Sequence, residues 1–103
     1  MSLEELQVSE KILAGTQVTD ESNIVPAGKL ITVHIYTASC PDSPAAFSRL
    51  EYGSDIKWIV QREGKLIHRI TFTSDGVSAV KVICVNGTSE DYYFNAYAKI
   101  GYE

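Results

Sequence analysis

Residues 91–102, with the sequence DYYFNAYAKIGY, alternate between two kinds of side chain. A period of two residues is typical of a β-strand whose faces differ, and an α-helix would instead repeat every 3.6 residues. The stretch therefore predicts a half-buried strand and indicates a β fold. One face would carry Tyr93, Asn95, Tyr97 and Lys99, and the core-facing side would carry Tyr92, Phe94, Ala96, Ala98 and Ile100.

Other strands are predicted earlier in the sequence. Residues 29–37 place β-branched Ile31, Val33 and Ile35 on one face, as expected of a strand. Residues 77–85 are apolar on both faces, which predicts a central strand covered on two sides. Residues 46–52 and 66–73 predict two more strands, and residues 6–13 predict an opening strand or extended arm. In residues 56–62 the core-facing side chains would be Ile56, Trp58 and Val60.

Turn signals separate these stretches. Pro26 fixes φ and Gly28 can adopt the positive φ of a type II turn, so residues 23–29 predict a turn before a strand. The short Gly-containing segment 63–65 predicts that residues 56–62 and 66–73 form a hairpin. Residues 74–76 and the pair Asn86-Gly87 likewise predict hairpin-type turns.

These signals predict an all-β fold, an antiparallel two-sheet β-sandwich or jelly roll of seven to eight strands. The 103 residues suit a single domain. Within it we expect residues 1–20 to form an N-terminal arm or edge strand and residues 21–103 to form the sandwich.

Composition narrows the possible partners. The net charge is −4 and the nine Lys and Arg residues are scattered, which argues against nucleic acid and against an anionic membrane surface. There is no apolar stretch of membrane-spanning length and no signal-peptide pattern, so we expect synthesis in the cytoplasm. Cys84 is expected as a buried thiol in a strand and Cys40 as a loop thiol, and a bridge between them stays open.

Motifs for catalysis are hard to find. His34 and His68 each fall in the middle of a strand on the polar face, without a recognisable nucleophile or carboxylate partner. A pair of Cys40 and His34 would lack a signature for the third, orienting residue. We expect no enzyme activity, no cofactor, and no catalytic or metal-binding residue.

Aromatic residues offer a better candidate for function, because six of the ten are tyrosines. Trp58 is expected in the core between the sheets. Tyr36, Tyr93 and Tyr97 fall on outward faces together with His34, and they form a candidate protein interface or ligand platform. The sheet faces of a small sandwich cannot all be buried by one chain, which favours self-association.

The turn at residues 23–33, NIVPAGKLITV, resembles an entry motif of small β-sandwich proteins in bacteriophage particles and tails. That resemblance implies a repeated structural subunit, usually a trimer or hexamer, that contacts other particle proteins and ends in a phage particle. It implies no site residues. The alternative is a carbohydrate-binding module that uses the exposed tyrosines, and a lesser alternative is a jelly-roll enzyme with His34 or His68 in a cleft.

Overall fold

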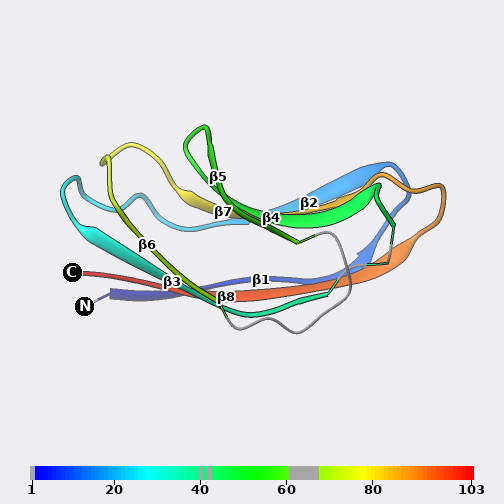
Figure 1. Cartoon of the computed structure of the whole chain (residues 1–103), viewed down its shortest axis with the longest axis horizontal. Helices are drawn as coiled ribbons and strands as arrows, with labels where there is room; N and C mark the ends of the chain where they lie inside the picture. The colour runs from blue at the N-terminus through cyan, green and yellow to red at the C-terminus, as the bar shows by residue number, and fades with distance from the viewer. Residues whose placement is uncertain (1, 40, 42, 61–67) are drawn as a thin grey trace.

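The computed structural model describes residues 2–39, 41, 43–60 and 68–103, with side chains for 4–36, 41, 43–59 and 69–103. These residues form eight strands in two antiparallel sheets, which confirms the predicted all-β sandwich. Sheet A has the order β1-β8-β3-β6 and sheet B the order β2-β7-β4-β5, and the two lie one above the other in Figure 1. The strands are β1 (Ser2–Ile12), β2 (Thr16–Glu21), β3 (Leu30–Ser39), β4 (Ala46–Tyr52), β5 (Asp55–Val60), β6 (His68–Thr73), β7 (Val80–Asn86) and β8 (Tyr92–Tyr102).

The strand pairs are nested, and this nesting defines the topology. β1 pairs with β8, β2 with β7, β3 with β6 and β4 with β5, all antiparallel. A long hairpin with its tip at β4 and β5 has thus been rolled over into two sheets, which is the jelly-roll arrangement. Because β1 is paired from Ser2 to Ile12 along β8, the two ends of the chain lie together at one end of the molecule (Figure 1).

Three of the predicted hairpin turns are wrong. β5 belongs to sheet B and β6 to sheet A, so they are not a hairpin, and residues 61–67 between them lie outside the described residues. Gly76 has the expected positive φ of 80°, yet it lies between β6 of sheet A and β7 of sheet B. Asn86 ends β7, and the chain then crosses to β8 in sheet A. A local turn signal specifies that the chain reverses, not which sheet it joins next.

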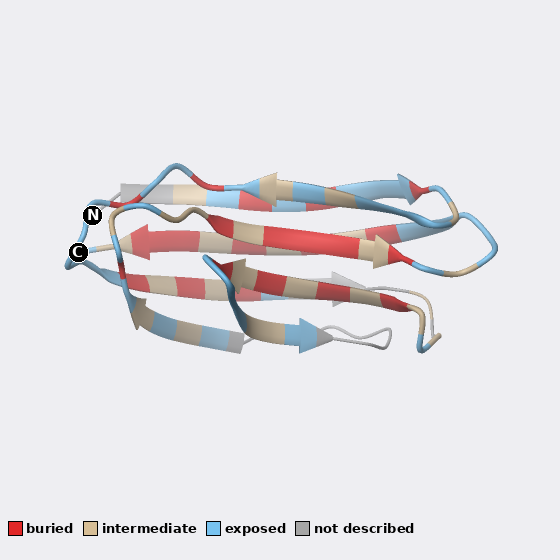
Figure 2. Ribbon diagram, turned by 90° about the horizontal axis from the view of Figure 1, so that it is seen from above, coloured by how far each residue is buried: buried red, intermediate tan, exposed pale blue. Residues whose placement is uncertain are grey.

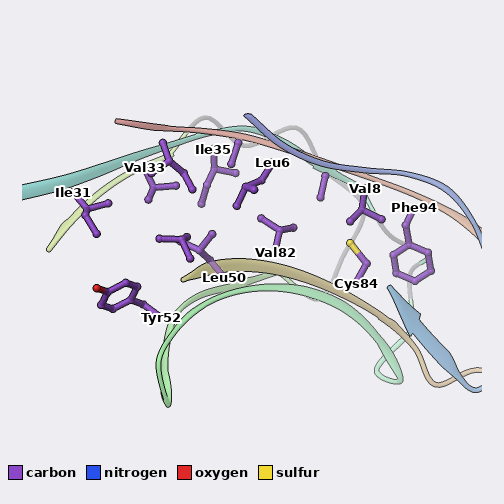
Figure 3. Close-up of a cluster of buried hydrophobic side chains, with 14 of the residues drawn as sticks. Leu6, Val8, Ile31, Val33, Ile35, Leu50, Tyr52, Val82, Cys84 and Phe94 are labelled. Carbon is purple, nitrogen blue, oxygen red and sulfur yellow. The ribbon is translucent and has the colours of Figure 1, made fainter. Parts of the chain in front are cut away.

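Apolar side chains from both sheets meet between the layers (Figure 3). The predicted core face of β8 is buried from Phe94 to Ile100, and Cys84 is buried as expected. Trp58 is partly buried and packs against this core, which agrees with its predicted place. β7 is central in sheet B, as predicted, and nearly continuous in red in Figure 2. The prediction that it is covered on two sides is not met, because sheet A covers only its inner face and Ile83 and Val85 lie on the outer side.

Two β-bulges shift the alternation of side chains. On β3 the pairing with β8 moves from Ile35 to Thr37, so Tyr36 is the additional residue. On β5 Trp58 pairs with Leu50 and Ile56 with Glu51, which leaves Lys57 as the additional residue. The prediction that Ile56 faces the core is therefore wrong, and Ile56 is 57% exposed on the outer side. The side chain of Val60 lies outside the described residues.

The turn that enters β3 has the conformation expected from its sequence. Gly28 has a φ of 80°, the positive value that a type II turn requires. The turn is held by Ser74, whose Oγ donates to the carbonyl of Pro26 at 2.5 Å and accepts from the Lys29 amide at 2.8 Å. The β2–β3 and β6–β7 connections are therefore packed together at one end of the sandwich.

Candidate functional site

The outer face of sheet A brings three of the four candidate residues together. The rings of Tyr36 and Tyr97 lie with centroids 5.6 Å apart and planes tilted by 31°. The His34 ring is stacked on Tyr36 at 6.2 Å. Burial raises the pKa of the Tyr97 hydroxyl, and a hydrogen bond with the Glu5 carboxylate raises that pKa further. The three rings form an aromatic cluster on β3 and β8.

The β3 bulge lies at Tyr36, within this cluster. An additional residue in one strand re-aims the side chains around it without disturbing the partner strand. Tyr36 has no partner in the register with β8, and its ring lies over the outer face, 40% exposed, between His34 and Tyr97. Tyr36 is outward by simple alternation with His34, and the effect of the bulge is that Thr37, rather than Tyr36, pairs with Tyr97 in the register.

Tyr93 lies apart from the aromatic cluster. It is four residues from Tyr97 along β8, a separation of about 13 Å in an extended strand. Its hydroxyl lies 2.6 Å from Ser9 Oγ on β1, and its register partner on that strand is Lys11. The candidate platform is thus divided into a cluster of three rings and a separate tyrosine that is 62% exposed.

A row of nitrogen-bearing side chains borders the cluster, and the sequence alone did not indicate it. His34 pairs with Lys99 on one side and with Arg69 on the other, so the three residues lie next to one another across β8, β3 and β6. The Lys99 ammonium lies 5.7 Å from the centroid of the Tyr36 ring, a cation–π distance, and 3.9 Å from the Glu5 carboxylate. We name Lys99, His34 and Arg69 the cationic row.

An open groove of about 540 Å³ runs beside the cationic row. Thr32 and Gly101, which pair with each other in the register, form its floor, and Gly101 leaves it open because it has no side chain. Leu30 and Glu103 line the far side, where their backbone groups exchange hydrogen bonds of 3.1 and 3.2 Å. Tyr36 closes one end, so rings, cations and hydroxyl groups converge on one hollow.

The outer face of sheet B has a different chemistry. Its register rows place Val85 beside Phe47, and set Arg49 between Ile83 and Ile59. We name the outward apolar residues of this sheet the apolar face: the exposed Ile56 and Ile59, the half-buried Phe47 and Val85, and Ile83, which is only 6% exposed. Charged side chains of both signs lie among them, with Arg49 and Glu51 paired at 2.7 Å and Lys81 and Glu21 at 4.0 Å.

Of the remaining candidates Cys40, His68 and Cys84, the structure describes the side chain of Cys84 alone. Cys40 and the side chain of His68 lie outside the described residues, so the possible bridge to Cys84 is not described. Cys84 itself is buried, with its sulfur 3.3 Å from Ser48 Oγ. In the described part of the chain, no three His, Cys, Asp or Glu residues are grouped closely enough to hold a metal ion. That part also contains no helix long and apolar enough to cross a membrane.

Comparison with known proteins supports the fold and does not extend to function. No protein-family model matches the sequence, and no curated protein matches it significantly. The crystal structure of FLHE is similar with a TM-score of 0.51 at 10% identity, covering 98% of this chain and 95% of that one. The CBM36-1 domain of a multidomain xylanase from the hindgut metagenome of Trinervitermes trinervoides has a TM-score of 0.46 at 13% identity, with 97% of each chain covered. At these identities the similarity concerns the fold alone, and we draw no conclusion from the CBM36-1 domain.

Proposed function

We propose that this chain is a non-catalytic assembly domain that associates with further copies of itself through the apolar face of sheet B. The observation that carries the proposal is the place of Phe47, Val85 and Ile59. All three lie on the side of sheet B that points away from the core of the sandwich. Apolar side chains on an outer face gain free energy when a partner removes them from water.

The charges around the apolar face favour a second copy of the same chain as that partner. Two acids, Glu21 and Glu51, lie in one register row with Lys81, and Arg49 lies in the next row. A face that carries both signs can set acids of one copy against cations of another. A face of a single charge sign would instead repel its own copy.

The proposed setting is a phage or prophage particle, with the chain as a repeated subunit. The support is the resemblance of residues 23–33 to the entry turn of particle and tail proteins, which also suggests a trimer or hexamer. The jelly roll is compatible with this role because it occurs in viral capsid proteins, although the same fold also occurs in lectin domains.

Sedimentation velocity of the wild-type protein from about 1 to 100 µM tests the proposal. We expect oligomers that dissociate on dilution, and variants Phe47→Lys and Ile59→Lys should sediment as monomers over most of this range, because each places an ammonium group in an apolar contact. Val77→Lys is the matched control, since Val77 is also an exposed apolar residue but lies in the β6–β7 connection, away from the apolar face.

Circular dichroism identifies any variant that fails to fold. A wild-type protein that stays monomeric at 100 µM would contradict the proposal. So would an equal loss of association in Val77→Lys, since this would show that added positive charge, rather than its position, weakens the contact.

A further inference from the structure

The groove on sheet A is not used by the assembly contact proposed above. It lies on the outer face of sheet A, whereas the apolar face is the outer side of sheet B, so the whole core separates the two surfaces. Its volume of about 540 Å³ is comparable to that of small-molecule sites, which are roughly 300–1,000 Å³. The groove is open, polar and lined by a ring, which favours a flat, polar ligand over an apolar one.

The charge of the groove is opposite to that of the chain. The protein carries a net charge of −4, yet the groove is lined by Arg69 and Lys99, with Glu103 on its far side and Glu5 3.9 Å from the Lys99 ammonium. His34 lies between the two cations in the register and adds a further hydrogen-bonding nitrogen. Such convergence of cations in an acidic protein favours a ligand with negative charge.

The arrangement of these cations favours a ligand that has more than one polar group. Lys99 and Arg69 are separated by one strand, β3, so their backbones lie about 10 Å apart. Arg69 presents a planar guanidinium suited to a carboxylate with two parallel hydrogen bonds, and Lys99 presents a single point charge. An extended molecule with spaced anionic and hydroxyl groups can contact both residues.

Tyr36 adds a ring surface against which a sugar ring can pack. Its ring is 40% exposed at the end of the groove, and the face of an aromatic ring is electronegative. The C–H groups of a pyranose ring are weakly positive and pack well on such a face. Thr32 on the floor supplies a hydroxyl that can donate to or accept from a sugar hydroxyl.

We propose that the groove binds a short anionic saccharide of the uronic acid class. A carboxylate pairs with Arg69, a neighbouring acidic or hydroxyl group contacts Lys99 and His34, and one sugar ring rests on Tyr36. This site does not depend on the proposed self-association, because none of its residues belongs to the apolar face.

Isothermal titration calorimetry of the intact protein with trigalacturonate, neutral galactotriose and inorganic phosphate tests this assignment. Trigalacturonate should bind at least tenfold more tightly than galactotriose, and phosphate should not displace it at equal concentration. Arg69→Gln and Lys99→Gln should each weaken trigalacturonate binding about ten- to a hundredfold, as expected for hydrogen bonds between charged groups. Tyr36→Leu should weaken the binding of both saccharides, because it removes a contact that does not depend on charge.

Lys11→Gln is the matched control. Lys11 lies on the same face of sheet A, opposite Tyr93 on β1 and outside the groove, so its loss should leave affinity unchanged within a factor of two. Equal weakening by Lys11→Gln and Arg69→Gln would reduce the effect to general charge attraction and overturn the site. No binding of trigalacturonate at millimolar concentration, or its full displacement by phosphate, would overturn the saccharide assignment.

The two proposals fail separately. The monomeric variant Ile59→Lys is changed only on sheet B, so it should bind trigalacturonate as the wild-type protein does. Retained binding in that variant together with a monomeric wild-type protein would refute the assembly contact and support the groove. Loss of association in Phe47→Lys, together with no saccharide binding by the wild-type protein, would support the assembly contact and refute the groove.

Discussion

Replacing Asn86 with alanine should destabilise the protein by about 2–4 kcal/mol, although Asn86 belongs to neither proposed surface. Asn86 ends β7, where the chain leaves sheet B for sheet A, and its side chain is fully buried. Its amide nitrogen donates to the carbonyls of Ile12 and Glu90, both at 2.8 Å. Its oxygen accepts from the amide of Thr88 at 3.1 Å and from the Thr88 hydroxyl at 2.6 Å.

The expected magnitude follows from what these partners would do without Asn86. The bond to the Ile12 carbonyl is buried, and a buried acceptor left without a donor costs about 1–3 kcal/mol. Glu90 and Thr88 are more exposed, so water can replace their bonds and the loss is about 0.5–1 kcal/mol in total. For a domain of this size the sum lowers the melting temperature by roughly 10–30 °C.

Urea and thermal unfolding followed by circular dichroism measure this effect. Asn23→Ala is the control, since Asn23 is exposed in the β2–β3 connection and should change the free energy of unfolding by less than about 0.5 kcal/mol. Asn86→Asp keeps the size but directs an oxygen at two carbonyl groups, so at neutral pH it should be at least as harmful as alanine. A loss below about 1 kcal/mol in both Asn86 variants would refute the reasoning.

Two further predictions concern the loops at the ends of the sandwich. Gly15→Ala should lower the free energy of unfolding by about 1–2 kcal/mol, because Gly15 has a φ of 73°. Gly76→Ala should lower it further, because a Cβ there would also lie 2.8 Å from the Cβ of Ala27. Equal losses in urea unfolding would contradict this close packing of the two loops. The Ser78 hydroxyl and backbone amides lower the pKa of the Asp75 carboxyl well below its usual range. Because this pKa is lower in the folded than in the unfolded protein, the ionised carboxylate stabilises the fold at pH values above the unfolded pKa of about 4, and this stabilisation is lost as the pH falls. The melting temperature of the wild-type protein should therefore fall more between pH 5 and 2 than that of Asp75→Asn.

Strands were predictable from this sequence where burial alternates without interruption. Along β8 the structure buries Phe94, Ala96, Ala98 and Ile100 as expected, although Tyr92, which was predicted on the same face, is exposed at the start of the strand. The alternation failed at Ile56, because a bulge adds Lys57 to β5 opposite an unbroken β4. A bulge is a property of two paired strands, and nothing in residues 55–60 alone distinguishes a strand with one from a strand without.

The connections were less predictable than the strands. Asn86-Gly87 has the composition of a tight hairpin, yet Gly87 does not adopt the positive φ that a type I′ turn requires. What decides the conformation is the burial of the Asn86 side chain against the carbonyl of Ile12, which is 74 residues earlier in the chain. Such a contact exists only after β1 has paired with β8, so no local pattern could reveal it.

The candidate site was predictable only in part, because some of its neighbours come from strands that lie far apart in sequence. His34, Tyr36 and Tyr97 could be assigned to an outward face because they follow the alternation of their own strands. Lys99 could be assigned to the same face as Tyr97, but its place beside His34, and that of Arg69, depends on the register of three strands that lie far apart in sequence. The separation of Tyr93 from the cluster likewise follows from distance along β8 rather than from the face it occupies.

The two proposed surfaces fit one molecule because a sandwich has two outer faces that share no residues. Copies that meet through sheet B direct sheet A, and therefore the groove, away from the contact. An assembly formed in this way presents several identical grooves on its outside, and a polymeric ligand can then occupy more than one of them. Once such a polymer occupies one groove, its binding to a second groove is intramolecular, which raises the overall affinity without any new contact. Self-association through sheet B would therefore strengthen the binding of a polymeric saccharide to sheet A, although each surface acts through its own side chains.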